Sequence, residues 1–451
     1  MPVYYDITDV LDYAQNNATL SGVQRTTLNI LCHLVNTQGP DHIHAIASHP
    51  VFHETRSYSA HFFGGAFDYD QKEFCTYFSL NMNDRFGLRE WLGRAGHAVQ
   101  SRIYRREIAF AAGDVVFIGG ATWGLARHLQ VLAERRHRDG IRIIHFIHDL
   151  IPLLAPEHVD DGLPQKFEAW LDFLAKNVDG FIVNSQATKA DLDDWLAARG
   201  HRAESRVVRL AHQFGQLERH SLAPAERFAV DPDIGARVRN VSRRPYVLCV
   251  GTMESRKNNW ALANVWRRLH ERLKDRTPRL IFAGNPGWLN EDFTGFLAGT
   301  GSLSGTISVI ERPTDRELAH LYRSCLFSVF ISHKEGWGLP IGEGLWLGRP
   351  VLCSNTSAMP EAGGELADYA DPSSLDSIEA AALRLITDDT YREARATQIA
   401  AAELRSWEDV AGDLWHALSA EHSRNLVAAR DGEAGLSAGT AARTVPAKEG
   451  A

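Results

Sequence analysis

Short apolar runs alternate with longer amphipathic stretches along most of this chain. The apolar runs are continuous and many of them end at Gly, Asp or Ser. They include residues 115–118, 143–147, 180–183, 246–250, 280–283, 307–310, 327–331 and 350–353. Continuous apolar strands separated by helices are typical of parallel sheets covered on both faces. The pattern therefore predicts an α/β protein built on doubly wound parallel sheets.

The length of the chain predicts two domains. At 451 residues it exceeds the size at which a single core keeps growing. The apolar rhythm fails between Gln213 and Pro245, where Pro, Gly and charged residues gather, so we place the linker there. We predict domains at 1–225 and 226–423 that face a central cleft, with a last amphipathic helix beginning near Trp407. Residues 424–451 have no apolar face and are predicted to be disordered.

Composition narrows the class of protein. The chain is 44% hydrophobic and 23% charged, as in ordinary globular proteins, and its formal charge of -8 argues against nucleic acid as a partner. The five cysteines are scattered without a CxxC pair, which favours reduced thiols in a cytosolic protein. The N-terminus lacks the basic region and apolar core of a signal peptide, and no stretch approaches ~18 apolar residues. We therefore expect a protein that is neither secreted nor membrane-spanning.

Two carboxylates eight residues apart, Glu335 and Glu343, bracket a glycine-rich segment. The first follows an apolar strand and the second lies about one turn inside the next helix, so both can face one cleft. Carboxylates accept hydrogen bonds from sugar hydroxyls, and a glycine-rich loop lets backbone N–H groups approach a ligand. The segment indicates a polyhydroxylated ligand that carries a phosphate.

A second motif lies where the strand at 246–250 is followed by a glycine turn and a helix start with Arg256 and Lys257. A diphosphate requires positive side chains together with the N–H groups of a helix start. Taken alone, the motif is explained as well by an exposed, solvated basic helix start.

The order of these segments closely resembles the donor-binding half of the retaining glycosyltransferases of family 4, also called group 1, which have the GT-B fold. The segments that carry the resemblance are 246–258, 280–288, 318–322, 332–343 and 350–361. The first half resembles the family more loosely, at 21–25, at the HDL-x-P segment 144–152 with Pro156 and Glu157, and at 181–188. The HDL-x-P segment resembles the mannosyltransferase-like branch. The resemblance implies two Rossmann-like domains, the first for the acceptor and the second for the nucleotide-sugar.

The resemblance also implies roles for particular residues. Glu335 would lie near the hydroxyls of the transferred sugar, Glu343 would bind the nucleotide ribose, and Arg256 and Lys257 would bind the diphosphate. His148 would lie near the reacting centre, although by itself a hydrogen-bonded strand-end histidine explains it as well. Further substrate-binding residues would be Gly22, Gly251, Thr252, Asn258, Gly284, Gly336, Trp337, Gly338 and Leu339. Thr252 stands where many relatives have Arg, and Trp337 stands where Phe is more common.

The implied activity is transfer of a hexose, with mannose favoured, from a nucleotide-diphosphate sugar to a saccharide or lipid-linked acceptor. Cell-surface polysaccharide or lipopolysaccharide synthesis is the expected setting. GDP-mannose is the favoured donor and UDP-hexoses remain open. The resemblance implies that the product retains the anomeric configuration of the donor. We expect neither a metal nor another cofactor, because no DxD pair is found in a suitable loop. The alternatives are a GT-B sugar-nucleotide-binding protein without transferase activity and a GT-B epimerase.

Three weaker features leave their interpretation open. The Arg-rich stretch 85–108 could lie on an anionic membrane at the inner face of the cell membrane, or pack as a solvated helix on its own domain. His42, His44, His49 and His53 lack a recognisable ligand spacing, so a metal site there is not favoured. Gly119 and Gly120 follow a strand and are expected to line the acceptor side of the cleft.

Overall fold

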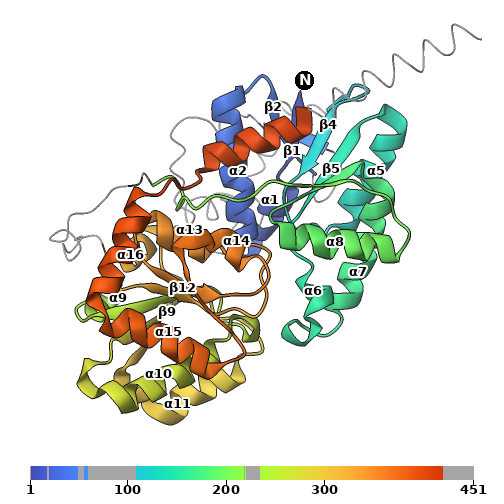
Figure 1. Cartoon of the computed structure of the whole chain (residues 1–451). Helices are drawn as coiled ribbons and strands as arrows, with labels where there is room; N and C mark the ends of the chain where they lie inside the picture. The colour runs from blue at the N-terminus through green and yellow to red at the C-terminus, as the bar shows by residue number, and fades with distance from the viewer. Residues whose placement is uncertain are drawn as a thin grey trace, which may run out of the picture.

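The protein is described by a computed structural model over residues 2–17, 20–48, 55–58, 108–217, 219 and 234–419. Two sheets flanked by helices make up this part of the chain, as Figure 1 shows. The first sheet has the strand order β3-β2-β1-β4-β5-β6-β7. Its strands are β1 (Val3–Asp6), β2 (Ile43–Ser48), β3 (Thr55–Tyr58), β4 (Val115–Ile118), β5 (Arg142–Ile147), β6 (Gly180–Val183) and β7 (Ser205–Val207).

All neighbouring strands in the first sheet are parallel except β2 and β3, which pair antiparallel from Ala45 with Tyr58 to Ser48 with Thr55. The predicted parallel sheet is confirmed, with one antiparallel strand added at this edge. β3 is short and polar, as an edge strand can be, and so carries no apolar run that would reveal it. The helices around the sheet are α1 (Thr8–Asn16), α2 (Gly22–Gln38), α5 (Ala126–Asp139), α6 (Ile151–Leu154), η2 (Pro156–His158), α7 (Leu163–Asn177) and α8 (Gln186–Ala198).

The second sheet is parallel throughout, in the order β10-β9-β8-β11-β12-β13. Its strands are β8 (Tyr246–Val250), β9 (Arg279–Gly284), β10 (Ile307–Glu311), β11 (Ser328–Phe330), β12 (Val351–Ser354) and β13 (Asp368–Ala370). The helical segments are α9 (Ala236–Val241), η4 (Ser255–Lys257), α10 (Asn259–Leu273), η5 (Lys274–Arg276), α11 (Glu291–Gly305), α12 (Asp315–Ser324), α13 (Leu339–Trp346), α14 (Met359–Gly363), η6 (Gly364–Leu366), α15 (Leu375–Thr387) and α16 (Asp389–Ala401).

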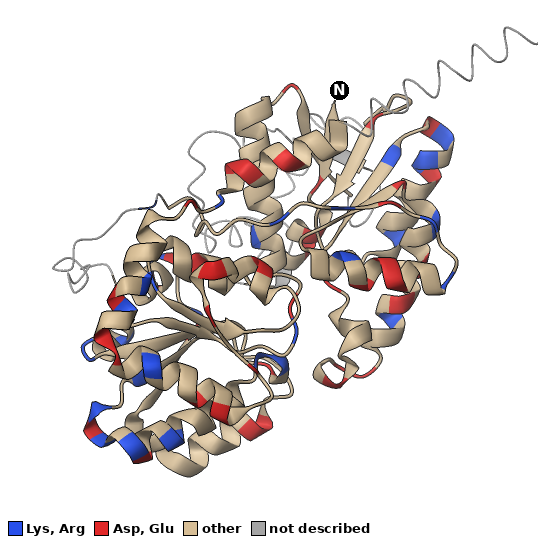
Figure 2. Ribbon diagram, viewed as in Figure 1, with Lys and Arg blue, Asp and Glu red and all other residues tan. Residues whose placement is uncertain are grey.

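The central strands are buried along their whole length, because helices cover both faces of each sheet. Every residue of β4 and of β8 is buried, which explains their continuous apolar sequences. The strands carry few charged residues, and the charges lie mostly on helices and loops (Figure 2). This arrangement confirms the predicted α/β class with doubly wound sheets.

Several helices begin where a polar side chain satisfies their first backbone N–H groups. Ser21 accepts from Val23 N at the start of α2, and Ser185 accepts from Thr188 N at the start of α8. Thr314 and Glu317 form a capping box on α12. These caps fix the residues at which α2, α8 and α12 begin.

Among the described residues, one of the four buried apolar clusters contains residues of both sheets. A helix over residues 407–419 returns to the first sheet, near α2 in Figure 1. Its Trp407 and Leu414 belong to the same buried cluster as Leu31 of α2 and Ile341 of α13. The indole Nε1 of Trp407 also donates to Gln213 O at 3.1 Å. The last helix therefore ties the second half of the chain back onto the first.

Several expectations fall partly or wholly outside the described residues. These include the boundary at 225/226, the tail 424–451, His49, His53 and all but residue 108 of the Arg-rich stretch. Within the described ranges, no helix has the length and apolar character needed to cross a membrane. The same ranges contain no group of three or more His, Cys, Asp or Glu side chains placed to hold a metal ion. Cys32, Cys249, Cys325 and Cys353 are buried free thiols.

Candidate active site

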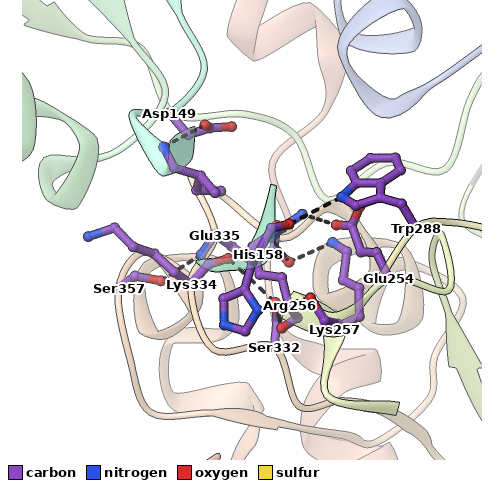
Figure 3. A network of polar contacts seen from close by, with 12 residues as sticks. Asp149, His158, Glu254, Arg256, Lys257, Trp288, Ser332, Lys334, Glu335 and Ser357 are labelled. Carbon is purple, nitrogen blue, oxygen red and sulfur yellow. Dashed lines mark hydrogen bonds and ion pairs between the residues drawn. The ribbon is translucent and has the colours of Figure 1, made fainter. Parts of the chain in front are cut away.

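The glutamate segment and the basic motif meet at one edge of the second sheet. Arg256 and Lys257 lie in η4, just after β8, and Glu335 lies in the loop between β11 and α13. β8 and β11 are parallel neighbours, so the loops that follow their carboxyl ends lie side by side. Figure 3 shows these side chains pointing toward one another. The sheet topology thus brings together residues that are far apart in sequence.

The carboxylate of Glu335 is held by two cations. Its Oε1 lies 2.6 Å from Arg256 Nη1 and 2.5 Å from Lys257 Nζ. Its backbone N–H donates to Ser357 Oγ at 2.9 Å. Burial raises the pKa of Glu335, but the charges of Arg256 and Lys257 outweigh it and lower that pKa to about 2. Glu335 is therefore ionised throughout the physiological pH range.

Other acidic groups surround the same two cations. Arg256 Nη2 lies 2.5 Å from Glu254 Oε1, and Arg256 Nη1 donates to Lys334 O at 2.6 Å. Asp149, from the first domain, lies above the cluster in Figure 3. Burial raises the pKa of Asp149, and the charge of Arg256 opposes this increase. Arg256 and Lys257 are thus held in fixed positions, and their ion-pair partners are carboxylates.

Glu343 has different partners from Glu335. Its Oε1 lies 3.0 Å from Arg25 Nη2 of α2, and its Oε2 accepts from Tyr322 Oη at 3.1 Å. Burial raises the pKa of Glu343, while Arg25 and Tyr322 oppose the increase. Glu335 and Glu343 therefore do not converge on the same cations, although both lie at the junction between the domains. Arg25 and Tyr322 were not among the predicted site residues.

The glycine-rich loop is in contact with the first domain. A Cβ atom on Gly336 would lie 1.9 Å from His148 O, so a larger residue does not fit there. Gly336 O also accepts from Thr188 Oγ1 at 3.3 Å. Gly338 has φ of 105°, which favours glycine, and Leu339 begins α13. The loop conformation is set jointly by its glycines and by the opposing domain.

Gly22 and Trp337 lie around this loop in different ways. A Cβ atom on Gly22 would lie 3.5 Å from Leu339 Cδ1, which places the start of α2 beside the start of α13. Trp337 is only 4% exposed and belongs to the apolar core. Its side chain therefore packs into the core and supports the glycine-rich loop from the core side.

Four predicted binding residues have contacts that maintain the fold. A Cβ atom on Gly284 would lie 2.1 Å from Gly251 O, so the turns after β8 and β9 require glycine to pack together. Asn258 has φ of 59° and its side-chain amide donates to Pro372 O at 2.8 Å. Thr252 O accepts from Glu254 N at 3.0 Å. These contacts place η4, and with it Arg256 and Lys257.

His148 has the geometry of a satisfied histidine at the end of a strand. Its Nε2 lies 2.8 Å from Gly119 O, the direction of a donated hydrogen bond. Burial lowers the pKa of His148 to about 4, so the imidazole is neutral at pH 7. Its backbone oxygen accepts from Asn184 Nδ2 at 2.7 Å and faces Gly336. In this structure the main chain of His148 meets the glycine-rich loop.

The segment at η2 makes a second contact across the junction. His158 Nδ1 lies 2.9 Å from Ser255 Oγ, and Trp288 Nε1 donates to His158 O at 3.1 Å. The rings of His158 and His333 stack at 5.4 Å. The sequence motif includes Pro156 and Glu157 but does not indicate these partners. Such long-range pairs have no local signal in the sequence.

Comparison with known proteins places this site in context. Residues 232–405 match the family of glycosyl transferases group 1, and residues 95–208 match the glucosyltransferase 3-like N-terminal domain. The chain is 38% identical over 165 residues to the O-antigen chain mannosyltransferase B of Escherichia coli, covering 36% of this chain and 43% of that protein. It is 25% identical over 262 residues to the serotype-specific mannosyltransferase WbdA of Escherichia coli, covering 58% and 32%. The matches span less than half the length of these relatives.

Solved structures agree in fold. The Anabaena Alr3699/HepE protein in complex with UDP and glucose has a TM-score of 0.60 at 14% identity, over 93% of this chain and 99% of that one. Sucrose-phosphate synthase from Thermosynechococcus elongatus has a TM-score of 0.60 at 16% identity, over 93% and 100%. The chain therefore has the GT-B fold, and its residues 232–405 match a group 1 glycosyl transferase domain.

Proposed function

We propose that this protein is a retaining hexosyltransferase that moves a mannose-like sugar from a nucleotide-diphosphate donor to a saccharide acceptor. The observation that carries the proposal is the cluster of Glu335, Arg256 and Lys257 within the group 1 domain. The similarity to two mannosyltransferases, one of them named for the O-antigen chain, supports a mannose donor and a role in cell-surface polysaccharide synthesis.

The cluster suits a diphosphate because its cations are held in place before any ligand binds. Arg256 is fixed by Glu254 and by Lys334 O, and Lys257 lies over the ring of Phe330 at 4.7 Å. A diphosphate would take over contacts now made by Glu335, with little rearrangement of the cations. Preorganised cations stabilise the charge that develops on a leaving phosphate. We therefore propose that the reaction requires neither a metal ion nor another cofactor.

In the proposed reaction, the bond between the anomeric carbon and the phosphate oxygen breaks, and its electron pair remains on the phosphate. The acceptor hydroxyl oxygen forms the new bond on the face that the phosphate leaves, which retains the configuration. The acceptor proton passes to the departing phosphate oxygen. Arg256 and Lys257 stabilise the diphosphate product, and Glu335 binds sugar hydroxyls after its release from the cations. Glu343 binds the ribose.

GDP-mannose is the favoured donor, with UDP-hexoses as the alternative. The proposed acceptor is a saccharide chain on a lipid carrier, which places the enzyme in the cytoplasm at the inner face of the membrane. A sugar-nucleotide-binding protein without transferase activity and a GT-B epimerase are the competing functions. Both would use the same fold and much of the same binding site.

The test is incubation of the purified protein with GDP-mannose, UDP-glucose and UDP-N-acetylglucosamine, with and without mannose oligosaccharides, each in the presence and in the absence of EDTA. Release of GDP that depends on the acceptor supports the proposal, and the Glu335→Gln variant should strongly reduce it. Nucleotide binding without release would identify a binding protein instead. Conversion of the donor to its epimer without release would identify an epimerase. Loss of activity in EDTA would contradict metal independence.

A further inference from the structure

Arg25 reaches from the first domain into the second and ends on a residue of the proposed donor site. It lies in the first turn of α2, just after the Ser21 cap. Its Nη2 is 3.0 Å from Glu343 Oε1, and the two side chains are 15% and 5% exposed. Its guanidinium also lies 5.4 Å from the centre of the Phe214 ring. A cation that is largely removed from water requires a firm partner, and the Glu343 carboxylate is that partner.

Arg25 in turn influences the ionisation of the Glu343 carboxylate. Tyr322 of α12 donates to Glu343 Oε2, whereas Asp315 at the start of α12 adds a like charge. Burial raises the pKa of Glu343, and Arg25 is the group that opposes this increase most strongly. Removal of Arg25 would therefore favour the protonated form of Glu343, which has one acceptor oxygen fewer available for a ligand.

The backbone contacts beside this ion pair fix its geometry. A Cβ atom on Gly342 would lie 2.8 Å from His212 Cα, and Gly22 faces Leu339. Gly342 therefore lets the helix that carries Glu343 pack closely against the His212 segment, and the start of α2 lies beside the start of α13. The ion pair therefore forms in one register between the two domains.

We propose that Arg25 is a positioning residue of the donor site, which holds and orients the Glu343 carboxylate so that it accepts hydrogen bonds from the nucleotide ribose. Nucleotide binding then depends on contact between the two domains, because the cation and the carboxylate come from different domains. This inference rests on the proposed function, in which Glu343 binds the ribose.

The chain offers a matched control for a merely structural ion pair. Arg209 also crosses the junction, with its Nε 3.6 Å from Glu361 Oε2, and it is 54% exposed. Glu361 accepts from the backbone N–H groups of Gln186 and Ala187 at 2.9 Å each. An effect of Arg25 on nucleotide binding that Arg209 does not share would therefore reflect Glu343.

The experiment measures the Kd of GDP and UDP by calorimetry between pH 5.5 and 9 for the wild type, Arg25→Met, Arg25→Lys and Arg209→Met. At pH 6 the Arg25→Met variant should bind more weakly than the wild type, because loss of the Arg25 charge raises the Glu343 pKa further and leaves less of the ionised carboxylate. Its affinity should recover as the pH rises, because Glu343 then ionises without help. The Kd of Arg25→Lys should lie between those of the wild type and Arg25→Met. Arg209→Met should bind nucleotide like the wild type.

A double-mutant cycle separates this role from general destabilisation. In the Glu343→Gln background, Arg25→Met should cause no further loss of nucleotide affinity. Unchanged or tighter binding by Arg25→Met, or a loss independent of pH, would overturn the inference. If Arg25→Met does not fold, the pH profile of Arg25→Lys decides in the same way. Failure of the wild type to bind any nucleotide would instead count against the proposed function.

Discussion

Glu335 and Glu343 are separated by a single loop and one turn of helix, yet their environments differ in a way that matters for function. Two cations of the second domain, Arg256 and Lys257, lie within 2.6 Å of Glu335, and its pKa falls to about 2. Glu343 has one cation, from the first domain, and a phenol, and its pKa is raised. Burial disfavours the charge of both, so the number of nearby cations decides the outcome.

The origin of the cations adds a second difference. The charge of Glu335 is set by residues of its own domain and would persist if the domains moved apart. The charge of Glu343 depends on contact with α2. The charge of Glu335 is thus set within the second domain, whereas the charge of Glu343 also requires Arg25 of the first domain.

The largest expected effect is on the chemical step. Glu335→Gln should reduce kcat by about 10²–10³-fold, because the sugar loses a charged acceptor at the reacting centre. Glu343→Gln should instead mainly raise the KM of the donor. Steady-state kinetics with varied donor separates the two variants. Glu379→Gln, which disrupts a surface pair with Arg268, is the control and should leave both constants unchanged. An unimpaired rate in Glu335→Gln would refute its assignment.

The contact between the glycine-rich loop and the first domain can be broken by one methyl group. Gly336→Ala should lower the free energy of unfolding by about 3 kcal/mol, because its Cβ would collide with His148 O. Gly412→Ala is the control, since nothing lies within 4 Å of that position, in the helix 407–419. The control should stabilise by about 0.5–1 kcal/mol. Urea denaturation measures both, and equal stability of the two variants would contradict the contact.

The opposite pKa shifts predict opposite effects of pH on stability. The unfolded chain takes up a proton on Glu335 near its ordinary pKa of 4.5, while the folded protein does so only near 2. Glu335 therefore stabilises the fold above pH 4.5, and this contribution, roughly 3 kcal/mol, is lost as the pH falls toward 2. Glu343 has a raised pKa, so its contribution declines as the pH rises through that value.

Denaturation of Glu335→Gln and Glu343→Gln across pH 3 to 8 measures this difference. The gap in unfolding free energy between the wild type and Glu335→Gln should narrow on the acid side. The Glu343→Gln variant should gain relative to the wild type as the pH rises. Parallel profiles for the two variants would show that the two carboxyl groups do not differ as described.

The smallest effect is expected where one of two cations is removed. Lys257→Met leaves Arg256 on Glu335, so the Kd of GDP should rise only about tenfold, as for loss of one charge-assisted contact. Lys334→Met is the control, because the Lys334 side chain pairs with Asp191 at 3.1 Å and not with Glu335. Calorimetry with GDP and guanosine tests whether the loss requires the diphosphate. Equal losses for both ligands would contradict a phosphate role for Lys257.

Much of the fold could be predicted from local patterns. The apolar runs at 115–118 and 246–250 became the buried strands β4 and β8, because a strand covered on both faces must be apolar throughout. β3 was missed, because an edge strand has no such requirement. The meeting of Arg256 and Lys257 with Glu335 followed from the family resemblance, and the parallel pairing of β8 with β11 accounts for it physically.

The sequence by itself determined the fold class, the glycine-rich loop and the residue types on which the proposed function depends, since these follow from local periodicity and from the chemistry of each side chain. Only the tertiary structure decided that Glu343 pairs with Arg25, that His148 donates to Gly119, and that Gly336 lies against His148. These contacts join segments that are distant along the chain. They form because the two domains pack in one register, and that register is a property of the complete fold.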